Sequence, residues 1–363
     1  MKKIAIIDAD LINRKKHRFP NLACLKMSGY WKEQGYNVKL LTEYNKDVLF
    51  GGYEQIFLSK VFTDTSVPDW VLELPNISYG GTGFFYDKAE RLKPEIEHHM
   101  PDYHLYDDFV NDQLSNGGKR IDFKYYLDYS IGFMTRGCFR QCPFCVNKNY
   151  KRVEKHSPLT EFMDVSRKKI CLLDDNFLGC PNWKEMLLEL KATGKPFRFH
   201  QGMDERILTD EKCELLFSSK YDGEITFAFD NIADYELIER KLQMIRRHTD
   251  KVVRFYVLVG FDRNEKYDLD FWQQDLWDMF KRIELLMKYQ AIPYIMRFNR
   301  YVESPYKGLY ITAAGWCNQP SLFKKKTITE FAQQRSKADV RYIELVQTEM
   351  PELANRYFNM RYK

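Results

Sequence analysis

The sequence predicts an α/β protein in which a parallel, barrel-like sheet lies between a smaller doubly wound α/β domain and a helical tail. Two observations predict this order. Short apolar runs alternate with longer amphipathic stretches through residues 1–110 and again through residues 125–305, and helical periodicity dominates residues 306–363. Such alternation is typical of parallel sheets covered by helices. The polar, glycine-containing stretch at residues 111–124 is predicted to link the first two domains.

The first domain begins with a compact apolar strand at Lys3–Ile7. An amphipathic helix is predicted from about Asn21 to Gln34, closed by Gly35. Three further strands are predicted at Asn37–Leu41, Gln55–Leu58 and Ile77–Tyr79. A doubly wound sheet of this kind binds ligands beyond the C-terminal ends of its strands.

Six strand candidates follow the linker, with helical stretches between them. The predicted strands are Tyr129–Thr135, Lys169–Leu173, Phe197–His200, Glu224–Phe229, Val252–Val259 and Pro293–Phe298. The predicted helices are residues 158–166, 182–193, 209–219, 233–248 and 268–290. Buried strands separated by helices predict a parallel barrel, in which the C-terminal strand ends carry the chemistry.

The tail contains a run of three lysines, Lys324 to Lys326, followed by a predicted helix over Ile328–Glu349 with Thr327 as its N-cap. Contact with nucleic acid is one interpretation of the lysines. A solvated entrance to the helix is the favoured one, because three lysines are too few to define a binding surface.

Composition restricts the class of protein. The 363 residues carry a formal charge of +5, which is compatible with an RNA or phosphate substrate without arguing for one. No stretch has the length of a membrane span, and the first residues do not form a signal peptide. Eight cysteines without a secretory signal indicate a reducing compartment. We therefore expect a cytoplasmic protein with no membrane partner.

Three cysteines, Cys138, Cys142 and Cys145, follow the first strand of the second domain at C-x₃-C-x₂-C spacing. Thiolates at such spacing are ligands for iron–sulfur clusters and zinc. The next cysteine, Cys171, is too distant along the chain to complete a finger-like set of four. Three ligands would leave one iron of a cubane cluster open for chemistry, as catalytic zinc sites keep one position open.

Residues 132–145, including the aromatic Phe144 before the last cysteine, resemble the cluster loop of the radical S-adenosylmethionine (radical SAM) superfamily. The resemblance implies a partial (βα)₆ TIM-like barrel, a [4Fe–4S] cluster on the three cysteines, and S-adenosylmethionine chelated by the open iron. It further implies a 5′-deoxyadenosyl radical that abstracts hydrogen from a substrate the sequence does not identify. The electron would come from a reductant such as flavodoxin or ferredoxin.

The second strand ends in Asp174, Asp175 and Asn176, which resemble the family's Asp-Asp-Asn-Phe run at the methionyl end of S-adenosylmethionine. Carboxylate and amide oxygens are acceptors for the ammonium group of that cofactor. A helix N-cap cluster is the structural alternative, because Asp and Asn favour such positions.

The other four strand ends supply further candidates for cofactor or substrate binding. We expect a polar group at the ribose, a glycine that lets the backbone approach adenine, and an arginine near an anionic carboxylate. An internal Asp204–Arg206 salt bridge is an equally good interpretation of that pair. The candidates, in chain order, are Gln201, Asp204, Arg206, Asp230, Gly260 and Arg297.

The first domain resembles the cobalamin-binding domain of one radical SAM class, and its Gly80-Gly81-Thr82 run supports that. The usual Asp-x-His-x-x-Gly motif is missing, since His17 has no aspartate two positions before it. A domain that binds substrate or packs on the barrel is therefore favoured over one that binds cobalamin. The histidines at positions 98, 99 and 104 are expected to pack or hydrogen-bond locally, with metal binding as the alternative.

Three classes of function remain open. The favoured class is a radical SAM enzyme, with a cobalamin-dependent methyltransferase as a variant. A non-catalytic iron–sulfur protein for electron transfer or sensing is the second class. It would not need the carboxylates at the strand ends. The third is a zinc-stabilised RNA-binding module, which colour alone would distinguish from a protein holding a brown cubane cluster.

Overall fold

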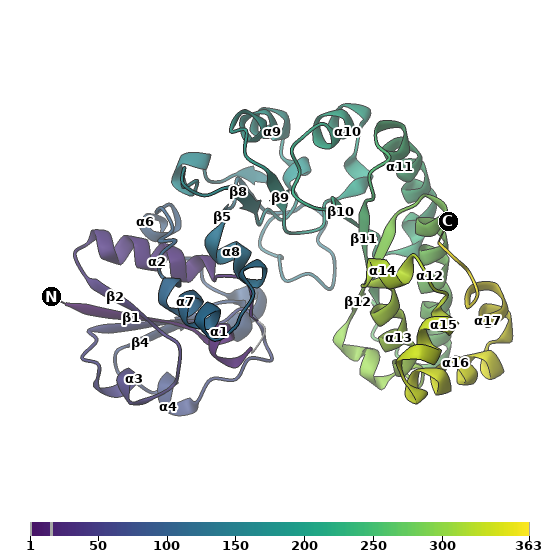
Figure 1. Cartoon of the computed structure of the whole chain (residues 1–363), viewed down its shortest axis with the longest axis horizontal. Coiled ribbons are helices and arrows are strands. Elements are labelled where there is room, and N and C mark those ends of the chain that lie inside the picture. The colour runs from purple at the N-terminus through teal and green to yellow at the C-terminus, as the bar shows by residue number, and fades with distance from the viewer. Residues whose placement is uncertain (1, 15–16, 363) are drawn as a thin grey trace. The chain divides into compact units, whose positions relative to one another are not determined.

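The computed structural model describes residues 2–14 and 17–362 (Figure 1). The chain folds as two compact units. The first contains residues 1–141, 145–174 and 193–197, and the second contains residues 142–144, 175–192 and 198–363. The predicted linker at residues 111–124 thus lies inside the first unit. Within the described ranges, no helix combines the length and the apolar character needed to span a membrane.

A four-stranded parallel sheet organises the N-terminal part of the first unit, with strand order β2-β1-β3-β4. Its strands are β1 (Lys3–Asp8), β2 (Asn37–Leu41), β3 (Gln55–Ser59) and β4 (Ile77–Gly80). Its helices are α1 (Ala9–Asn13), α2 (Leu22–Glu33), α3 (Lys46–Phe50), α4 (Asp69–Leu72), α5 (Thr82–Phe85), α6 (Pro94–Glu97) and α7 (Asp107–Ser115). The four predicted strands are confirmed.

Helices cover both faces of this sheet. Ile6 of β1 packs with Cys24 and Met27 of α2 on one face, whereas Ile7 packs with Val48 of α3 on the other. Figure 1 shows α2 on one side of the strands and α3 and α4 on the opposite side. Because side chains alternate along a strand, neighbouring residues of β1 enter different cores. The prediction of a doubly wound α/β layer is confirmed.

Helix α2 forms where the sequence predicted it, for the predicted reasons. The Asn21 side chain accepts hydrogen bonds from the backbone N–H groups of Ala23 and Cys24, at 3.0 and 3.3 Å. These two donors have no partner within the helix, so the cap stabilises its first turn. Gly35 follows the C-terminus with a φ of 82°, in the left-handed region that glycine adopts readily.

All six strands predicted for the second domain are present, but they form two three-stranded sheets. The first has the order β5-β8-β9 and the second β10-β11-β12, with the assigned β5–β8, β10–β11 and β11–β12 pairs parallel. Their bounds are β5 (Tyr129–Gly132), β8 (Lys169–Leu172), β9 (Phe197–Phe199), β10 (Thr226–Ala228), β11 (Arg254–Val259) and β12 (Ile292–Arg297). Four helices follow these strands: α9 (Trp183–Ala192), α10 (Asp210–Phe217), α11 (Tyr235–His248) and α12 (Leu269–Lys288).

The predicted helix at residues 158–166 is wrong. The segment contains only a short 3-10 turn at Leu159–Glu161. Its backbone groups bind partners from elsewhere in the first unit, since the Phe162 carbonyl accepts from the Tyr103 hydroxyl at 2.7 Å and Asp164 N donates to Ser130 Oγ at 3.0 Å. These tertiary hydrogen bonds replace those that a helix would have formed.

Two further predictions are corrected by the helices. The expected linker is largely helical, with the end of α7, the 3-10 turn Arg120–Phe123 and helix α8 (Lys124–Leu127). The single helix expected from Ile328 to Glu349 is two helices, because Ser336 breaks it and caps the second by accepting from Asp339 N. The tail helices are α13 (Lys307–Cys317), α14 (Pro320–Phe323), α15 (Ile328–Arg335), α16 (Lys337–Glu349) and α17 (Pro351–Tyr357).

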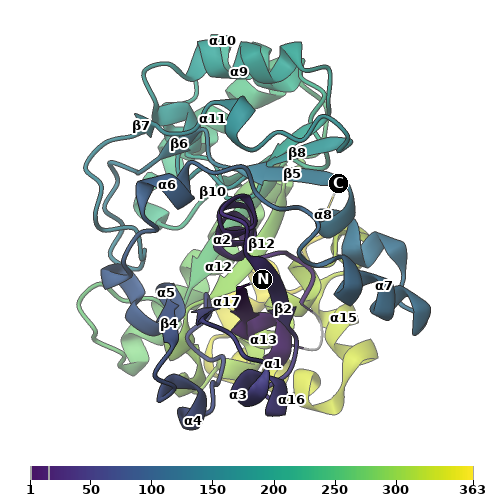
Figure 2. The ribbon, with the colours of Figure 1, turned by 90° about the vertical axis from the view of Figure 1, so that its left-hand side faces the viewer.

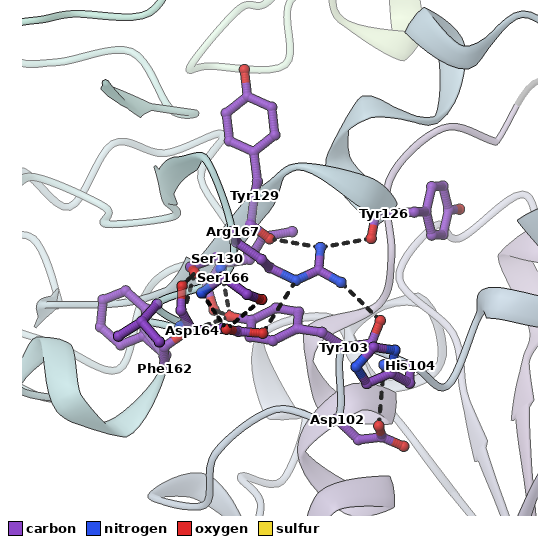
Figure 3. Close-up of polar contacts among 12 residues, drawn as sticks. Asp102, Tyr103, His104, Tyr126, Tyr129, Ser130, Phe162, Asp164, Ser166 and Arg167 are labelled. Carbon is purple, nitrogen blue, oxygen red and sulfur yellow. Dashed lines mark hydrogen bonds and ion pairs between the residues drawn. The ribbon is translucent and has the colours of Figure 1, made fainter. Parts of the chain in front are cut away.

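A buried arginine fixes strand β5 within the first unit. The Arg167 guanidinium donates to the carbonyls of Tyr126, Tyr129 and Tyr103 at 2.6, 3.2 and 2.9 Å (Figure 3). The Tyr103 hydroxyl accepts from Ile131 N in β5 at 2.7 Å. A polar side chain is stable in such surroundings only when its donors are paired, and here three are.

Candidate functional site

The cysteine loop starts and ends at a short hairpin. Strand β6 (Thr135–Arg136) pairs antiparallel with β7 (Glu154–Lys155), and the two lie side by side in Figure 2. Residues 137–153 form the loop between them and carry the three cysteines. Gly137 has a φ of 98°, and a Cβ atom there would lie 2.3 Å from the Arg152 carbonyl. Only glycine fits this entry to the loop.

The thiols have surroundings suited to iron or zinc. All three are half-buried. Backbone N–H groups two positions further along donate to two of them, from Arg140 to Cys138 Sγ at 3.5 Å and from Asn147 to Cys145 Sγ at 3.4 Å. Such bonds stabilise the thiolate, which is the form that binds metal. Across residues 2–14 and 17–362, no three His, Cys, Asp or Glu side chains are already gathered as a metal site, so the ligand set stays a prediction.

Asp174 anchors the chain just before this loop. Its carboxylate is buried and accepts from Met134 N at 3.2 Å, from Thr135 N at 2.6 Å and from the Thr135 hydroxyl at 2.7 Å. Asp174 therefore holds the start of the hairpin. Asp175 is half-buried and Asn176 is buried, and the Asn176 side chain does not cap the 3-10 turn that follows it. Contact of these residues with S-adenosylmethionine stays a prediction.

Within the second unit, which includes Phe144, aromatic rings pack together near two strand ends. The Phe144 and Phe261 centroids are 5.4 Å apart with the rings at 78°, and those of Phe261 and Phe298 are 4.9 Å apart at 82°. Phe261 lies two residues after the end of β11, and Phe298 directly follows β12. Edge-to-face pairs of this kind are a favoured arrangement of aromatic side chains. The exposed Arg297 lies beside Phe298, and its Nη1 donates to the Tyr301 hydroxyl at 3.1 Å.

Asp230 and Gly260 meet at the end of β11. Asp230 Oδ1 accepts from Leu258 N at 3.2 Å, and Gly260 N donates to Asp275 Oδ2 at 2.8 Å. Asp275 also accepts from the Tyr310 hydroxyl at 2.7 Å. Gly260 has a φ of 73°, so the turn after β11 depends on glycine. The structure thus brings two predicted site residues together with the aromatic rings at one strand end.

Arg282, which sequence reasoning missed, holds these strand ends from behind. It is fully buried in α12, and its Nη1 donates to the carbonyls of Phe229, Asp230 and Leu258 at 3.1, 3.1 and 2.9 Å. Burial raises the pKa of Asp230 to about 6, and the positive charge of Arg282 opposes this rise. The sequence contained one sign of this role. Arg282 is three positions from Met279 and four from Leu286, so it lies on the apolar face of the helix.

Asp204 and Arg206 form the salt bridge that was one of their two interpretations. Arg206 Nε lies 2.7 Å from Asp204 Oδ1, and its Nη1 lies 3.2 Å from Asp234 Oδ2. Between them, Glu205 is buried and accepts from Ala228 N at 3.1 Å. Burial raises the pKa of Glu205 to about 8. Gln201 is exposed, and its contact with a ligand stays a prediction.

The histidine tract makes hydrogen bonds within the first unit, some of them local, as the favoured interpretation predicted, and two of them to distant segments. His98 Nδ1 lies 2.8 Å from Glu161 Oε2, His99 Nε2 lies 2.9 Å from Glu33 Oε2, and His104 Nδ1 lies 2.7 Å from an Asp107 oxygen. The first two partners come from distant parts of the sequence. The tract therefore makes contacts with two distant segments of the first unit, around Glu33 and Glu161.

A cavity of about 680 Å³ lies in the N-terminal α/β layer. Aromatic side chains and the Gly80-Gly81 pair line it. Gly81 has a φ of 107°, and a Cβ atom there would lie 2.3 Å from the Lys60 carbonyl, so packing of the chain itself already requires this glycine.

The His17 Nδ1 atom is 2.8 Å from the Tyr126 hydroxyl, and burial lowers the pKa of His17 to about 4.

Comparisons with known proteins gave one similar solved structure. No protein-family model and no curated protein matches the chain. Among solved structures, the chain is similar to the cobalamin-dependent S-adenosylmethionine radical enzyme OxsB, solved with aqua-cobalamin and S-adenosylmethionine bound. The two share 12% sequence identity and a TM-score of 0.47, over 99% of this chain and 64% of that one. The chain thus spans less than two thirds of the length of OxsB.

Proposed function

We propose that this protein is a radical SAM enzyme, in which Cys138, Cys142 and Cys145 hold a [4Fe–4S] cluster. The observation that carries the proposal is the C-x₃-C-x₂-C loop, in which backbone N–H groups donate to the Cys138 and Cys145 sulfurs. Three thiolates are the donor set that binds such a cluster and leaves one iron open. The strands after the loop would form the partial (βα)₆ barrel of that superfamily.

The residues at the strand ends would position S-adenosylmethionine. Asp175 would accept from the ammonium group, and Asp230 would accept from the ribose hydroxyls. The rings of Phe144 and Phe261 would enclose the adenine beside Gly260, where the backbone leaves room for a flat base. Arg297 is exposed and would meet an anionic group of the cofactor or the substrate.

Cys138, Cys142 and Cys145 would hold the cluster, which would supply one electron to the sulfonium of S-adenosylmethionine. Cleavage of the C5′–S bond would give methionine and a 5′-deoxyadenosyl radical, and that radical would take a hydrogen atom from the substrate to become 5′-deoxyadenosine. The electron would come from a small reductant such as a flavodoxin or a ferredoxin. These proteins meet the cluster in the cytoplasm, where we place this enzyme.

Replacing Asp175 by alanine is expected to weaken S-adenosylmethionine binding about tenfold or more, because a charge-assisted hydrogen bond contributes about 1.5–3 kcal/mol. Iron content should be unchanged, since Asp175 is not a cluster ligand. Equilibrium binding of S-adenosylmethionine to the reconstituted protein measures this, with Asp210→Ala, an exposed carboxylate on α10, as the matched control. Equal affinities of the two variants would assign Asp175 a structural role.

A cobalamin-dependent methyltransferase is a second candidate, favoured by the cavity of about 680 Å³ beside Gly80 and Gly81. No residue of the missing Asp-x-His-x-x-Gly motif is available for cobalt, and His17 is hydrogen-bonded to Tyr126. The cofactor would therefore have to bind without a histidine ligand. Retention of corrinoid absorbance after hydroxocobalamin is added and the protein is desalted would support this candidate. A protein that elutes free of corrinoid would remove it.

A further inference from the structure

A network of charged side chains in the first unit ends two residues before the first cysteine of the loop. Lys26 of α2 is buried, and its Nζ donates to Glu97 Oε1 at 3.0 Å and to the Glu97 carbonyl. The same Oε1 atom lies 4.0 Å from Arg136 Nη2 and 3.4 Å from His156 Nε2. One carboxylate oxygen therefore connects helix α2 with both sides of the hairpin that bears the cysteine loop.

The hairpin places this network close to a predicted cluster ligand. Arg136 is the last residue of β6, and its Cα is within about 7 Å of the Cys138 Cα, because two residues of chain cannot span more. His156 directly follows β7, and its backbone N–H donates to the Met134 carbonyl at 2.8 Å. The network thus touches the chain on both sides of the loop.

Burial makes these charges effective. The side chains of Lys26, Glu97 and Arg136 are 4%, 16% and 27% exposed, so water and salt screen them only in part. Burial lowers the pKa of Lys26, and the charge of Glu97 opposes this. Arg136 packs its guanidinium 3.7 Å from the centre of the Phe133 ring. The Arg136 Nε atom is buried and has no hydrogen-bond partner among the described residues. It is therefore an unused hydrogen-bond donor next to the loop.

Two more titratable groups, His98 and Glu161, face the network from its outer side. His98 stacks on His156 with ring centroids 5.0 Å apart, and Glu161 binds His98 Nδ1 at 2.8 Å. Glu161 is 28% exposed and pairs with His98, so it opposes the inner cations less than Glu97 does. Of the charged side chains in the network, Lys26 and Glu97 are therefore the least exposed.

We propose that the Lys26–Glu97–Arg136 network sets the reduction potential of the cluster on the cysteine loop, an inference that rests on the proposed function. A cubane held by three thiolates is anionic, and the added electron makes it more so. Nearby positive charge therefore favours the reduced form, and nearby negative charge disfavours it. The N-terminal α/β layer supplies Lys26 and Glu97 to this network. The layer would therefore contribute to the reaction without binding a cofactor itself.

Two variants test this because they break the same ion pair while changing the charge in opposite directions. Lys26→Met removes a positive charge, so the reduction potential should fall. Glu97→Gln removes a negative charge, so the potential should rise. The measurement is an anaerobic redox titration of the full chain, reconstituted with iron and sulfide and without S-adenosylmethionine, followed by electron paramagnetic resonance. A purely structural role would shift both variants in the same direction.

The control is Lys32→Met on the same helix, where the lysine is 44% exposed and paired with Asp102. It should leave the potential near that of the wild type. Arg136→Met removes the other cation from a less buried position, and its potential should fall as well, which keeps the test available if Lys26→Met does not fold. Shifts of one sign in all variants, or no shifts, would overturn the inference and leave the proposed function intact. A wild-type chain that binds no iron would instead overturn the proposed function, and this inference with it.

Discussion

The Cys142→Ala protein is expected to bind no stable iron–sulfur cluster and to form no 5′-deoxyadenosine. Two thiolates cannot hold a cubane that needs three protein ligands, and cluster affinity depends on the complete ligand set. The loss should be complete rather than partial, because every cofactor step proposed here depends on the cluster. Iron and sulfide content after anaerobic reconstitution, together with the brown absorbance, measure the effect.

The matched control is Cys213→Ala, which removes a buried thiol from α10. Its iron content should equal that of the wild type, although the cavity it leaves lowers stability. Cys138→Ala and Cys145→Ala should behave as Cys142→Ala does. A Cys142→Ala protein with full iron content would contradict the assignment of the loop as the cluster site.

Replacing Arg167 by methionine is expected to lower the free energy of local opening of strand β5 by about 3 kcal/mol. This is the second of the two largest effects that we predict. The change removes the hydrogen bonds that Arg167 donates to the buried carbonyls of Tyr103, Tyr126 and Tyr129, and each buried hydrogen bond lost costs about 1–3 kcal/mol. Methionine keeps much of the volume, so the effect reports the lost hydrogen bonds rather than a cavity.

Hydrogen exchange of the β5 amides at residues 129–132 measures this local opening. The rate should rise about a hundredfold, since each 1.4 kcal/mol is a factor of ten. Lys168→Met, at the neighbouring exposed lysine, should change the rate little, because the weak surface pair with Asp128 at 3.7 Å contributes at most about 1 kcal/mol. Equal rates in the two variants would show that Arg167 does not hold the strand.

Local signals in the sequence were sufficient to predict most elements of the fold. The cap at Asn21, the left-handed Gly35 and the apolar runs of ten strands act over a few residues, so a pattern reveals them. The division of the six strands predicted for the barrel into two sheets depends on pairings between distant segments, which periodicity does not encode. The prediction of a helix at residues 158–166 is wrong for the same reason. Tyr103 and Ser130, which are distant in the sequence, form hydrogen bonds with backbone groups of this segment.

The candidate site shows the same limit. Spacing or residue type marks the cysteines, Gly260 and Phe144 in the sequence, and their contact with a cofactor stays a prediction. The role of Asp174 at Thr135, 39 positions away, could not be found, and neither could the contact of Lys26 with Glu97, 71 positions away. A sequence pattern therefore marks candidate cofactor-binding residues more readily than residues that hold the chain in place through long-range contacts.

Formation of 5′-deoxyadenosine tests the central claim most directly. The full chain would be reconstituted anaerobically with iron and sulfide, reduced with dithionite, and supplied with S-adenosylmethionine. We predict that the nucleoside and methionine form in equal amounts, and that Cys142→Ala yields neither. A brown protein that forms no nucleoside would contradict the account and favour an electron-transfer or sensing protein. A colourless protein that binds zinc would contradict it as well, in favour of a zinc-stabilised module.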